Sequence, residues 1–340
     1  MSQIPNYPPP LTVSNVPPVP RSRFKSGCAC GCGTSLLIFF LILCFGLTLQ
    51  SSSTSSANRV VISGPDSPFK DDCDKVAVIK INEAIMETDG FIYDQIEDVK
   101  EDSTVKAIVL RMDTPGGSVS ASDYFYHKLT ELRKKTNIPI VVSMGSVCAS
   151  GGYYIAMSCG NENEGVLFAE PTTWTGSIGV IISKYDVSEL AQKVGVKEDS
   201  IKSHELKGMG SMLRPMTEQE QTIFQALVND AFGRFREVVY TGRKKFNDDH
   251  DALTPLATGQ VFTTKDALES GLIDREGYLE DAINRAIEMA KLDREKTQVF
   301  TYTAKASLMD LVISSQEKLK KTEVKEIQEM AAPKALYLWQ

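Results

Sequence analysis

Histidine is scarce in this chain: among its 340 residues only His127, His204 and His250 occur. His127 falls on the polar side of a predicted helix, and His250 lies in the acidic loop Asp248–Asp251, so we expect both to be solvated. Histidine is the usual base that activates a serine or cysteine nucleophile. Its scarcity makes a serine–histidine enzyme a poor expectation, and any nucleophilic chemistry needs another base.

The chain also lacks the cysteine patterns that staple small domains or hold metals. Its seven cysteines are Cys28, Cys30, Cys32, Cys44, Cys73, Cys148 and Cys159. The first three alternate beside an apolar run without further ligands, and the later ones are scattered, so neither a metal site nor a disulfide framework is expected. Cys148 is expected to be a packed small side chain. No metal or organic cofactor is expected.

The chain also lacks a net positive charge. The formal net charge is −7, and residues 1–58 carry Arg21, Arg23 and Lys25 without any acid before Arg59, so the remainder is clearly acidic. An acidic surface argues against binding to nucleic acid.

The uncharged stretch from Ser26 to Asn58 contains the apolar run Leu36–Leu49. With the small residues from Cys28 onward, this run reaches the ~20 residues that a bilayer core requires. We therefore predict one N-terminal transmembrane helix within residues 26–50, acting as an uncleaved signal anchor. The basic cluster before it predicts a cytoplasmic N-terminus and an extracytoplasmic remainder. A cleaved signal peptide is the alternative.

Composition sets the remaining boundaries. Residues 1–25 form a Pro-rich cytoplasmic tail without apolar periodicity, which predicts disorder. Residues 51–70 are predicted to be a linker. A regular pattern starts near residue 75, which places the main domain at 71–290. Residues 291–340 are predicted to form a helix-prone segment followed by an apolar tail.

Short apolar runs typical of strands recur across the main domain at a spacing of about 30 residues, with helical patterns between them. They are Val76–Ile81, Lys106–Arg111, Ile138–Ser143 and Val166–Ala169. Strands that alternate with helices at this spacing predict parallel βαβ units and an α/β fold. One intervening helix should contain Ala121, Tyr124, Phe125, Leu129 and Leu132.

A longer helix is predicted to start at Thr217, which can form a capping box with Glu220. Its apolar positions predict one buried face. They are Ile223, Phe224, Leu227, Val228, Ala231, Phe232 and Phe235. Farther on, residues 261–274 predict a strand, a short helix that begins at a threonine cap, and a glycine C-cap.

Ser150 follows the apolar strand Ile140–Val142 and precedes Gly151 and Gly152. At a strand-to-helix corner a serine is exposed for attack, and glycines leave room for a substrate backbone. The N–H of Gly151 would be one of the unused donors of a helix start. A hydroxyl beside such donors is half of an acyl-transfer site, although Ser-Gly-Gly is also a common turn composition.

A second glycine pair, Gly116-Gly117, follows the strand that contains Arg111. Sites in α/β proteins gather at the carboxyl ends of parallel strands, so the N–H of Gly117 would supply a second oxyanion donor beside Gly151. The base that remains is lysine, as in serine–lysine pairs. A lysine acts as a base only when its amine is neutral, so the site must desolvate it enough to lower its pKa toward the working pH.

Several segments together resemble the signal peptide peptidase A family, in its short, membrane-anchored form. They are Asp113–Ser118, Ala149–Tyr154, Thr175–Val180 and Gly259–Asp274. The likeness covers roughly residues 73–290 and includes the predicted anchor. It implies a serine–lysine peptidase of the cell (inner) membrane, on a Clp/crotonase-like spiral of βαβ units. It also implies a ring-like homo-oligomer, an octamer for short members, in which neighbouring subunits complete each site.

By this resemblance Ser150 is the catalytic nucleophile, Ser177 orients the lysine, and Gly117 and Gly151 provide the oxyanion N–H groups. The family lysine precedes a Met-Thr helix start.

Counting back from Met216-Thr217 gives Lys207 as the lysine, with Lys202 as the alternative. The family usually has an aromatic or histidine residue before the lysine and Ser-Pro after it, whereas this chain has Leu206 and then Ser211-Met212. These departures leave the choice between the two lysines open.

The implied substrates are released signal peptides and other apolar peptides in or near the membrane, bound by strand addition. Three alternatives remain: a related membrane peptidase that trims a stomatin-type partner, a crotonase-like enzyme that acts on acyl thioesters without needing Ser150, and an inactive membrane scaffold. The apolar segment Ala335–Gln340 adds a further hypothesis, because it can occupy a substrate groove as product or inhibitor, or simply pack against the oligomer.

Overall fold

The computed structural model describes residues 58–64, 73–160, 162, 165–303 and 335–338. The predicted cytoplasmic tail, the transmembrane helix at 26–50 and the helix-prone segment before the apolar tail lie outside these residues. Within the described part, no helix is both long and apolar enough to cross a bilayer.

The described elements follow one another along the chain as strands, α-helices and short 3-10 turns (η). In order they are β1 (Asn58–Ser63), β2 (Lys75–Asn82), α2 (Phe91–Glu101), β3 (Val105–Thr114), β4 (Gly116–Ser118), α3 (Val119–Thr136), β5 (Ile140–Ala149), α4 (Gly151–Ala156), η1 (Met157–Cys159), β6 (Leu167–Ala169), β7 (Trp174–Gly176), β8 (Ile181–Ile182), α5 (Ser188–Lys193), η2 (Glu205–Gly208), α6 (Glu218–Gly242), α7 (Lys244–Asp248), η3 (Asp251–Leu253), β9 (Val261–Thr263), α8 (Thr264–Ser270), β10 (Arg275–Glu276), α9 (Leu279–Met289), β11 (Gln298–Thr303) and β12 (Ala335–Leu338).

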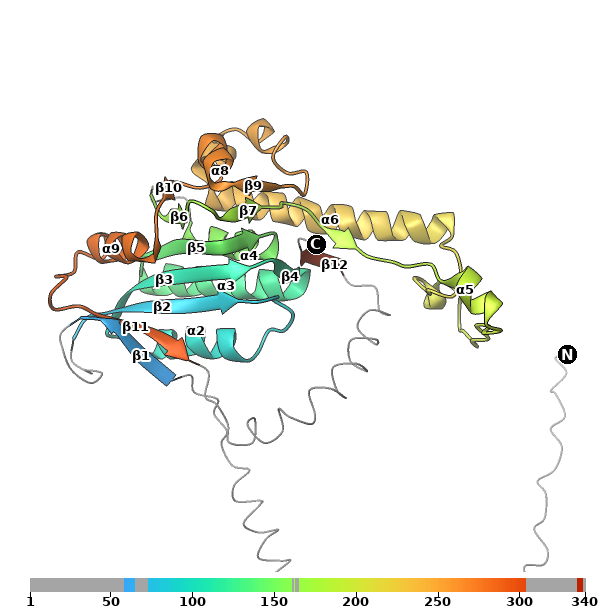
Figure 1. Cartoon of the computed structure of the whole chain (residues 1–340), viewed down its shortest axis with the longest axis horizontal. Helices are drawn as coiled ribbons and strands as arrows, with labels where there is room; N and C mark the ends of the chain where they lie inside the picture. The colour runs from blue at the N-terminus through green and yellow to red at the C-terminus, as the bar shows by residue number, and fades with distance from the viewer. Residues whose placement is uncertain (1–57, 65–72, 161, 163–164, 304–334, 339–340) are drawn as a thin grey trace, which may run out of the picture. The chain divides into compact units, whose positions relative to one another are not determined.

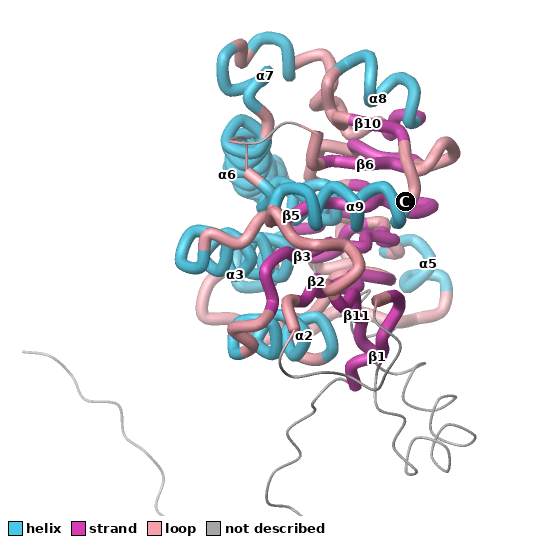
Figure 2. Tube along the Cα trace, turned by 90° about the vertical axis from the view of Figure 1, so that its left-hand side faces the viewer, coloured by secondary structure: helices cyan, strands magenta, loops and turns pink. Residues whose placement is uncertain are grey.

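The fold is mixed α/β, built on a largely parallel sheet with the strand order β1-β11-β2-β3-β5-β6-β10. Every pairing along this path is parallel except that of β1 with β11. Figure 2 shows these strands stacked in this order, with α2, α3 and α6 on one side of them. The central strands are apolar throughout because a parallel sheet is covered on both faces; Val76–Ile79 and Ala107–Leu110 are fully buried.

The βαβ alternation predicted from the sequence is confirmed in β2-α2-β3 and β3-α3-β5, where the two strands of each unit are parallel neighbours. Two strands run farther than their apolar cores suggested: β3 continues to Thr114 and β5 to Ala149. The predicted capping box of Thr217 and Glu220 is present. At residues 261–274 the strand, the Thr263 cap and the left-handed Gly271 (φ 84°) are as expected.

The predicted buried face of α6 is confirmed only in part. Phe235 is buried and Leu227 is 51% exposed, while the other predicted apolar positions are half-buried. The C-terminal half of α6 packs on the body of the molecule through Phe235, Val238 and Val239. Figure 1 shows the N-terminal half projecting beyond the sheet together with α5. The helix is amphipathic, but periodicity does not say whether the chain itself covers the apolar side.

The sheet also recruits strands from outside the predicted 71–290 domain. β1 comes from the predicted linker and β11 from the segment predicted to be helix-prone. β11 pairs with both β1 and β2, so it joins the first described strand to the centre of the sheet.

Candidate active site

Ser150 occupies a tight corner between β5 and α4. Its backbone has φ 52° and ψ −115°, in a half of the conformational map that residues other than glycine rarely adopt. Two hydrogen bonds fix the corner: Ser150 N–H donates to the Gly176 carbonyl at 2.8 Å, and Tyr154 N–H donates to the Ser150 carbonyl at 2.9 Å. The residue is 1% exposed, and no described residue hydrogen-bonds to its Oγ. A hydroxyl without a partner among the described residues, at a strained corner, fits a nucleophile that awaits a base.

Ser177 lies beside Ser150 because β7 pairs in parallel with β5. Ala149 is in register with Gly176, so the two serines follow paired residues on neighbouring strands. Ser177 is buried and has φ 51°. Its Oγ–H donates to the Gly259 carbonyl at 2.9 Å. Because the hydroxyl proton is used there, its lone pairs remain to accept a hydrogen bond from an amine, which suits the orienting role predicted for it.

The N–H of Gly117 points away from the body of the sheet. Ile85 N–H donates to the Gly116 carbonyl and Ser118 N–H donates to the Ile85 carbonyl, each at 2.8 Å. Backbone groups alternate in direction along a strand, so the N–H and C=O of Gly117 face the opposite side. A Cβ at this position would lie 1.9 Å from the Ile85 oxygen, so only glycine fits here.

Gly151 begins α4, and the start of that helix lies against β3 and β4. The contact is close: a Cβ on the next residue, Gly152, would lie 2.7 Å from the Thr114 Cγ2. Thr114 is itself paired with Cys148 across β3 and β5. The structure therefore brings the predicted Ser150, Ser177, Gly117 and Gly151 to one edge of the sheet.

Both lysine candidates lie elsewhere, on the segment 183–217, which we call the arm. The arm connects β8 to α6 and contains α5 and η2 (Figure 1), and it lies beyond the far end of α6, away from α4. Two contacts hold the base of the arm: Lys184 Nζ donates to the Arg214 carbonyl at 3.0 Å, and the Arg214 guanidinium pairs with Glu220 at the start of α6. Within one chain the arm thus keeps Lys202 and Lys207 away from Ser150.

The two lysines differ in their surroundings. Lys202 Nζ lies 2.5 Å from Glu198 Oε1 and is partly buried; this hydrogen bond lowers the pKa of Glu198 to about 2. Lys202 also covers Gly208, where an added Cβ would lie 2.4 Å from its Nζ. The side chain of Lys207 is exposed and forms no hydrogen bond or ion pair with any other described residue. Lys202 is engaged within the arm, whereas Lys207 remains available.

The strand β12 lies in a slot between β4 and β8 and is antiparallel to both. Tyr337 is opposite Gly117, and Leu336 is opposite both Ser118 and Ile181. The same strand is also close to α3, α4 and α6. The apolar segment picked out in the sequence is therefore extended at Ala335–Leu338, as predicted, and it covers the edge of β4 to which the Gly117 N–H points.

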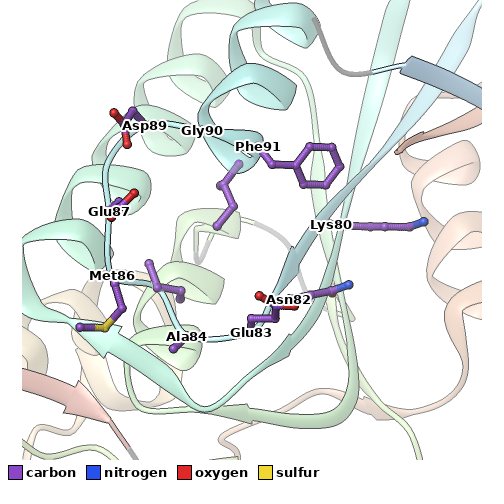
Figure 3. A pocket seen from close by; sticks show the side chains of 11 residues that line it. Lys80, Asn82, Glu83, Ala84, Met86, Glu87, Asp89, Gly90 and Phe91 are labelled. Atoms are coloured by element: carbon purple, nitrogen blue, oxygen red, sulfur yellow. The ribbon is translucent and has the colours of Figure 1, made fainter. Parts of the chain in front are cut away.

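A separate pocket of about 530 Å³ lies on the other side of β4 from this slot. Figure 3 shows the loop from Asn82 to Gly90 curving around it, with Met86 and Glu87 on one side of the pocket and Lys80 and Phe91 on the other. Ile85 joins this pocket to the site, because it lines the pocket and is also bridged to Gly117.

Sequence reasoning missed β8 and Ile85. A two-residue strand such as Ile181–Ile182 is too short to show periodicity, and the role of Ile85 depends on the backbone of β4. Cys148 was placed correctly as a packed residue: it is fully buried, and burial raises the pKa of its thiol. In the described part of the chain, no group of three or more His, Cys, Asp or Glu side chains is arranged to hold a metal ion.

Known proteins share this sequence pattern. The model of Peptidase family S49 matches residues 132–293. The chain is 39% identical over 236 residues to a putative protease of Synechocystis, covering 69% of this chain and 81% of that protein. It is 38% identical over 198 residues to a putative signal peptide peptidase SppA of Enterococcus faecium, covering 58% and 55% of the two chains. It is 35% identical over 248 residues to Protease 4 of Salmonella typhi, covering 71% and 38%.

A looser likeness exists among solved structures. A membrane-bound stomatin-specific protease in complex with a substrate peptide gives a TM-score of 0.42 at 18% identity, covering 72% of this chain and 98% of that one. A likeness at this level does not inform the site. The sequence relatives, however, define the class of protein: the chain is a serine peptidase. It belongs to peptidase family S49 and is similar to signal peptide peptidase SppA and Protease 4.

Proposed function

We propose that this chain is a membrane-anchored serine endopeptidase whose Ser150–Lys207 dyad is completed between two subunits of a homo-oligomer. The observation that carries the proposal is the division of the site. Ser150, Ser177, Gly117 and Gly151 converge on one edge of the sheet, while Lys207 stands exposed on an arm that leads away from it. Since no described residue bonds to Ser150 Oγ, we take the base from a neighbouring copy of the chain.

In the proposed reaction, Lys207 of a neighbouring subunit takes the proton of Ser150 as its oxygen attacks a peptide carbonyl. Ser177 accepts a hydrogen bond from the amine and holds it in place. The N–H groups of Gly117 and Gly151 bind the oxyanion. The amine product leaves with the proton, and water then hydrolyses the acyl-enzyme. A lysine serves as a base only when it is shielded from water, and docking of the arm on a second subunit would provide the shielding.

The arm and the start of α6 expose apolar side chains that suit such docking. Tyr185 is 60% exposed, Leu190 61% and Val194 67%, and Leu227 lies on the uncovered side of α6. Exposed apolar clusters of this kind mark interaction surfaces. A second copy of the chain is the proposed occupant, because the arm also carries the lysine that the serine site requires. The ring of eight subunits implied by the family resemblance belongs to the same proposal.

The substrate class follows from the slot between β4 and β8. We assign to it extended apolar peptides, including released signal peptides, bound by strand addition. In support, Ala335–Leu338 already lie there as a strand between two edges. The segment would then act as a substrate-like inhibitor held by its own chain. The predicted anchor at 26–50 would hold the slot on the extracytoplasmic side of the inner membrane, where such peptides occur.

Subunit mixing tests the divided dyad. Full-length Ser150→Ala and Lys207→Ala are each expected to be inactive toward an apolar peptide, while Lys202→Ala retains activity. When the two inactive variants are dissociated together and reassembled, sites that combine intact Ser150 with intact Lys207 should restore part of the activity. Inactive mixtures that assemble normally would place both residues in one chain. Activity in Lys207→Ala would remove the dyad, and Ser150-independent turnover of acyl thioesters would favour a crotonase-like enzyme.

A further inference from the structure

The turn that carries Lys207 is connected through Arg214 to the buried carboxylate of Glu220. Glu220, 2% exposed, lies in the first turn of α6 and accepts the Thr217 N–H at 3.0 Å. Its other partner is Arg214, whose Nη1 lies 2.9 Å from Glu220 Oε2 and whose Nη2 binds Oε1. A two-pronged bond between guanidinium and carboxylate fixes the plane of both groups. The hydrogen bond from Arg214 is the largest of the influences that lower the pKa of Glu220 to about 2.

The same guanidinium reaches the lysine turn. Arg214 Nη2 also donates to the Gly208 carbonyl at 2.9 Å, and Gly208 is the residue directly after Lys207. Around this point η2 is tight: Lys207 N–H donates to the His204 carbonyl at 3.0 Å and Met209 N–H to the Leu206 carbonyl at 3.1 Å. A fixed carbonyl at the end of so short a turn restrains the Cα–Cβ direction of the lysine before it.

We propose that Arg214 and Glu220 are positioning residues for catalysis, which set the direction in which Lys207 leaves the arm. The inference rests on the proposed function, since it assumes that Lys207 is the base. It gives a role to an ion pair in which the carboxylate is buried and the guanidinium is partly exposed. It also separates the two lysines, because Lys202 helps to build the arm through Glu198 while Arg214 and Glu220 aim Lys207. A misplacement of about 1 Å in a reacting group can lower turnover about 100-fold, so such aiming has a measurable effect.

The test uses the full-length chain in detergent, with an apolar peptide as substrate. Arg214→Ala and Glu220→Gln are expected to lower kcat about 10- to 100-fold with KM within twofold of wild type, and Arg214→Lys to recover only part, since lysine lacks the planar fork. Arg236→Ala is the matched control, because Arg236 lies on α6, the helix of Glu220, and binds Tyr240 instead of the arm. Its kcat should equal that of wild type.

A double-mutant cycle separates positioning from general loss of structure. An activated peptide ester, which needs less help from a base, reports the residual activity of Lys207→Ala. If Arg214 acts through Lys207, adding Arg214→Ala to that background changes nothing further. A second drop, or a loss of activity that parallels loss of the oligomer, would overturn the positioning role.

The failures of the two proposals can be told apart. Full activity in Lys207→Ala overturns the dyad and the positioning role together. An inactive Lys207→Ala combined with wild-type kcat in Arg214→Ala and Glu220→Gln overturns the positioning role alone.

Discussion

Removal of residues 333–340 is expected to raise peptidase activity. The register places Tyr337 opposite Gly117, and Ala335 and Leu336 opposite Ile182 and Ile181. Because the Gly117 N–H points toward β12, the strand competes for the donor that the oxyanion needs. A substrate peptide that uses the same edge of β4 must first displace it.

The size of the effect can be worked from the pairing. About four backbone hydrogen bonds, each worth a net ~0.5–1.5 kcal/mol, give the strand about 2–6 kcal/mol. Closing the chain between Thr303 and Ala335 costs about 3 kcal/mol. The balance runs from about −1 to about 3 kcal/mol. Its favourable part leaves the slot mostly occupied by a modest margin, so deletion should raise kcat/KM by up to about 100-fold.

The assay is hydrolysis of a fluorogenic apolar peptide by the full-length chain and by the deletion variant, with oligomer mass measured in parallel. A synthetic peptide of residues 334–340 should inhibit the deletion variant competitively. Tyr337→Pro removes the N–H that can bond to the Gly117 carbonyl and should act like the deletion, whereas Tyr337→Ala keeps that N–H and serves as the matched control. Unchanged kcat/KM with a smaller oligomer would instead support simple packing. If activity and assembly both stay the same, neither role for the segment survives.

Three further predictions concern the site, the assembly and the first strand. Gly117→Ala should lower kcat at least 100-fold, because its Cβ would lie 1.9 Å from a backbone oxygen and displace the oxyanion donor; circular dichroism checks that the fold persists. Leu227→Asp should weaken self-association at least tenfold in mass photometry, whereas a purely intramolecular role for this side of α6 predicts no change. Burial raises the pKa of Asp102, but hydrogen bonds from Thr104 and Arg59 outweigh it and lower the pKa from 3.8 to about 2. Asp102 therefore contributes stability above about pH 4 that is lost as the pH falls toward about 2. Asp102→Asn should lower the free energy of unfolding by about 2 kcal/mol at about pH 7. In urea titrations the variant should also show a flatter dependence of stability on pH.

Much of the fold could be predicted from patterns among neighbouring residues. The apolar runs located the central strands because parallel strands are buried on both faces. Thr217 with Glu220, and Thr263 with Gly271, marked helix ends because capping depends on a few neighbouring residues. Ser150 and Gly117 became candidates because each follows an apolar run in the sequence, although β3 and β5 extend beyond those runs.

Signals that depend on distant parts of the chain could not be predicted. The periodicity of α6 showed an apolar side but not what covers it, and Leu227 proved exposed. The need for glycine at position 117 comes from Ile85, which lies far away in sequence. The ion pair between Lys202 and Glu198 is close in sequence (i,i+4), but it lies outside the helices of the structure, so helical periodicity did not point to it.

Two features of the structure act in the same direction. The lysine proposed as the base stands exposed on the arm, and a segment of the same chain occupies the slot proposed for the substrate. An isolated chain would therefore have neither a shielded base nor an open groove. The proposed membrane anchor would raise the local concentration of subunits and so favour docking of each arm on a neighbour. If the dyad is shared in this way, activity should rise more steeply than linearly with enzyme concentration on dilution below the assembly midpoint. The deletion variant should show the same steepness, because opening the slot does not supply the lysine.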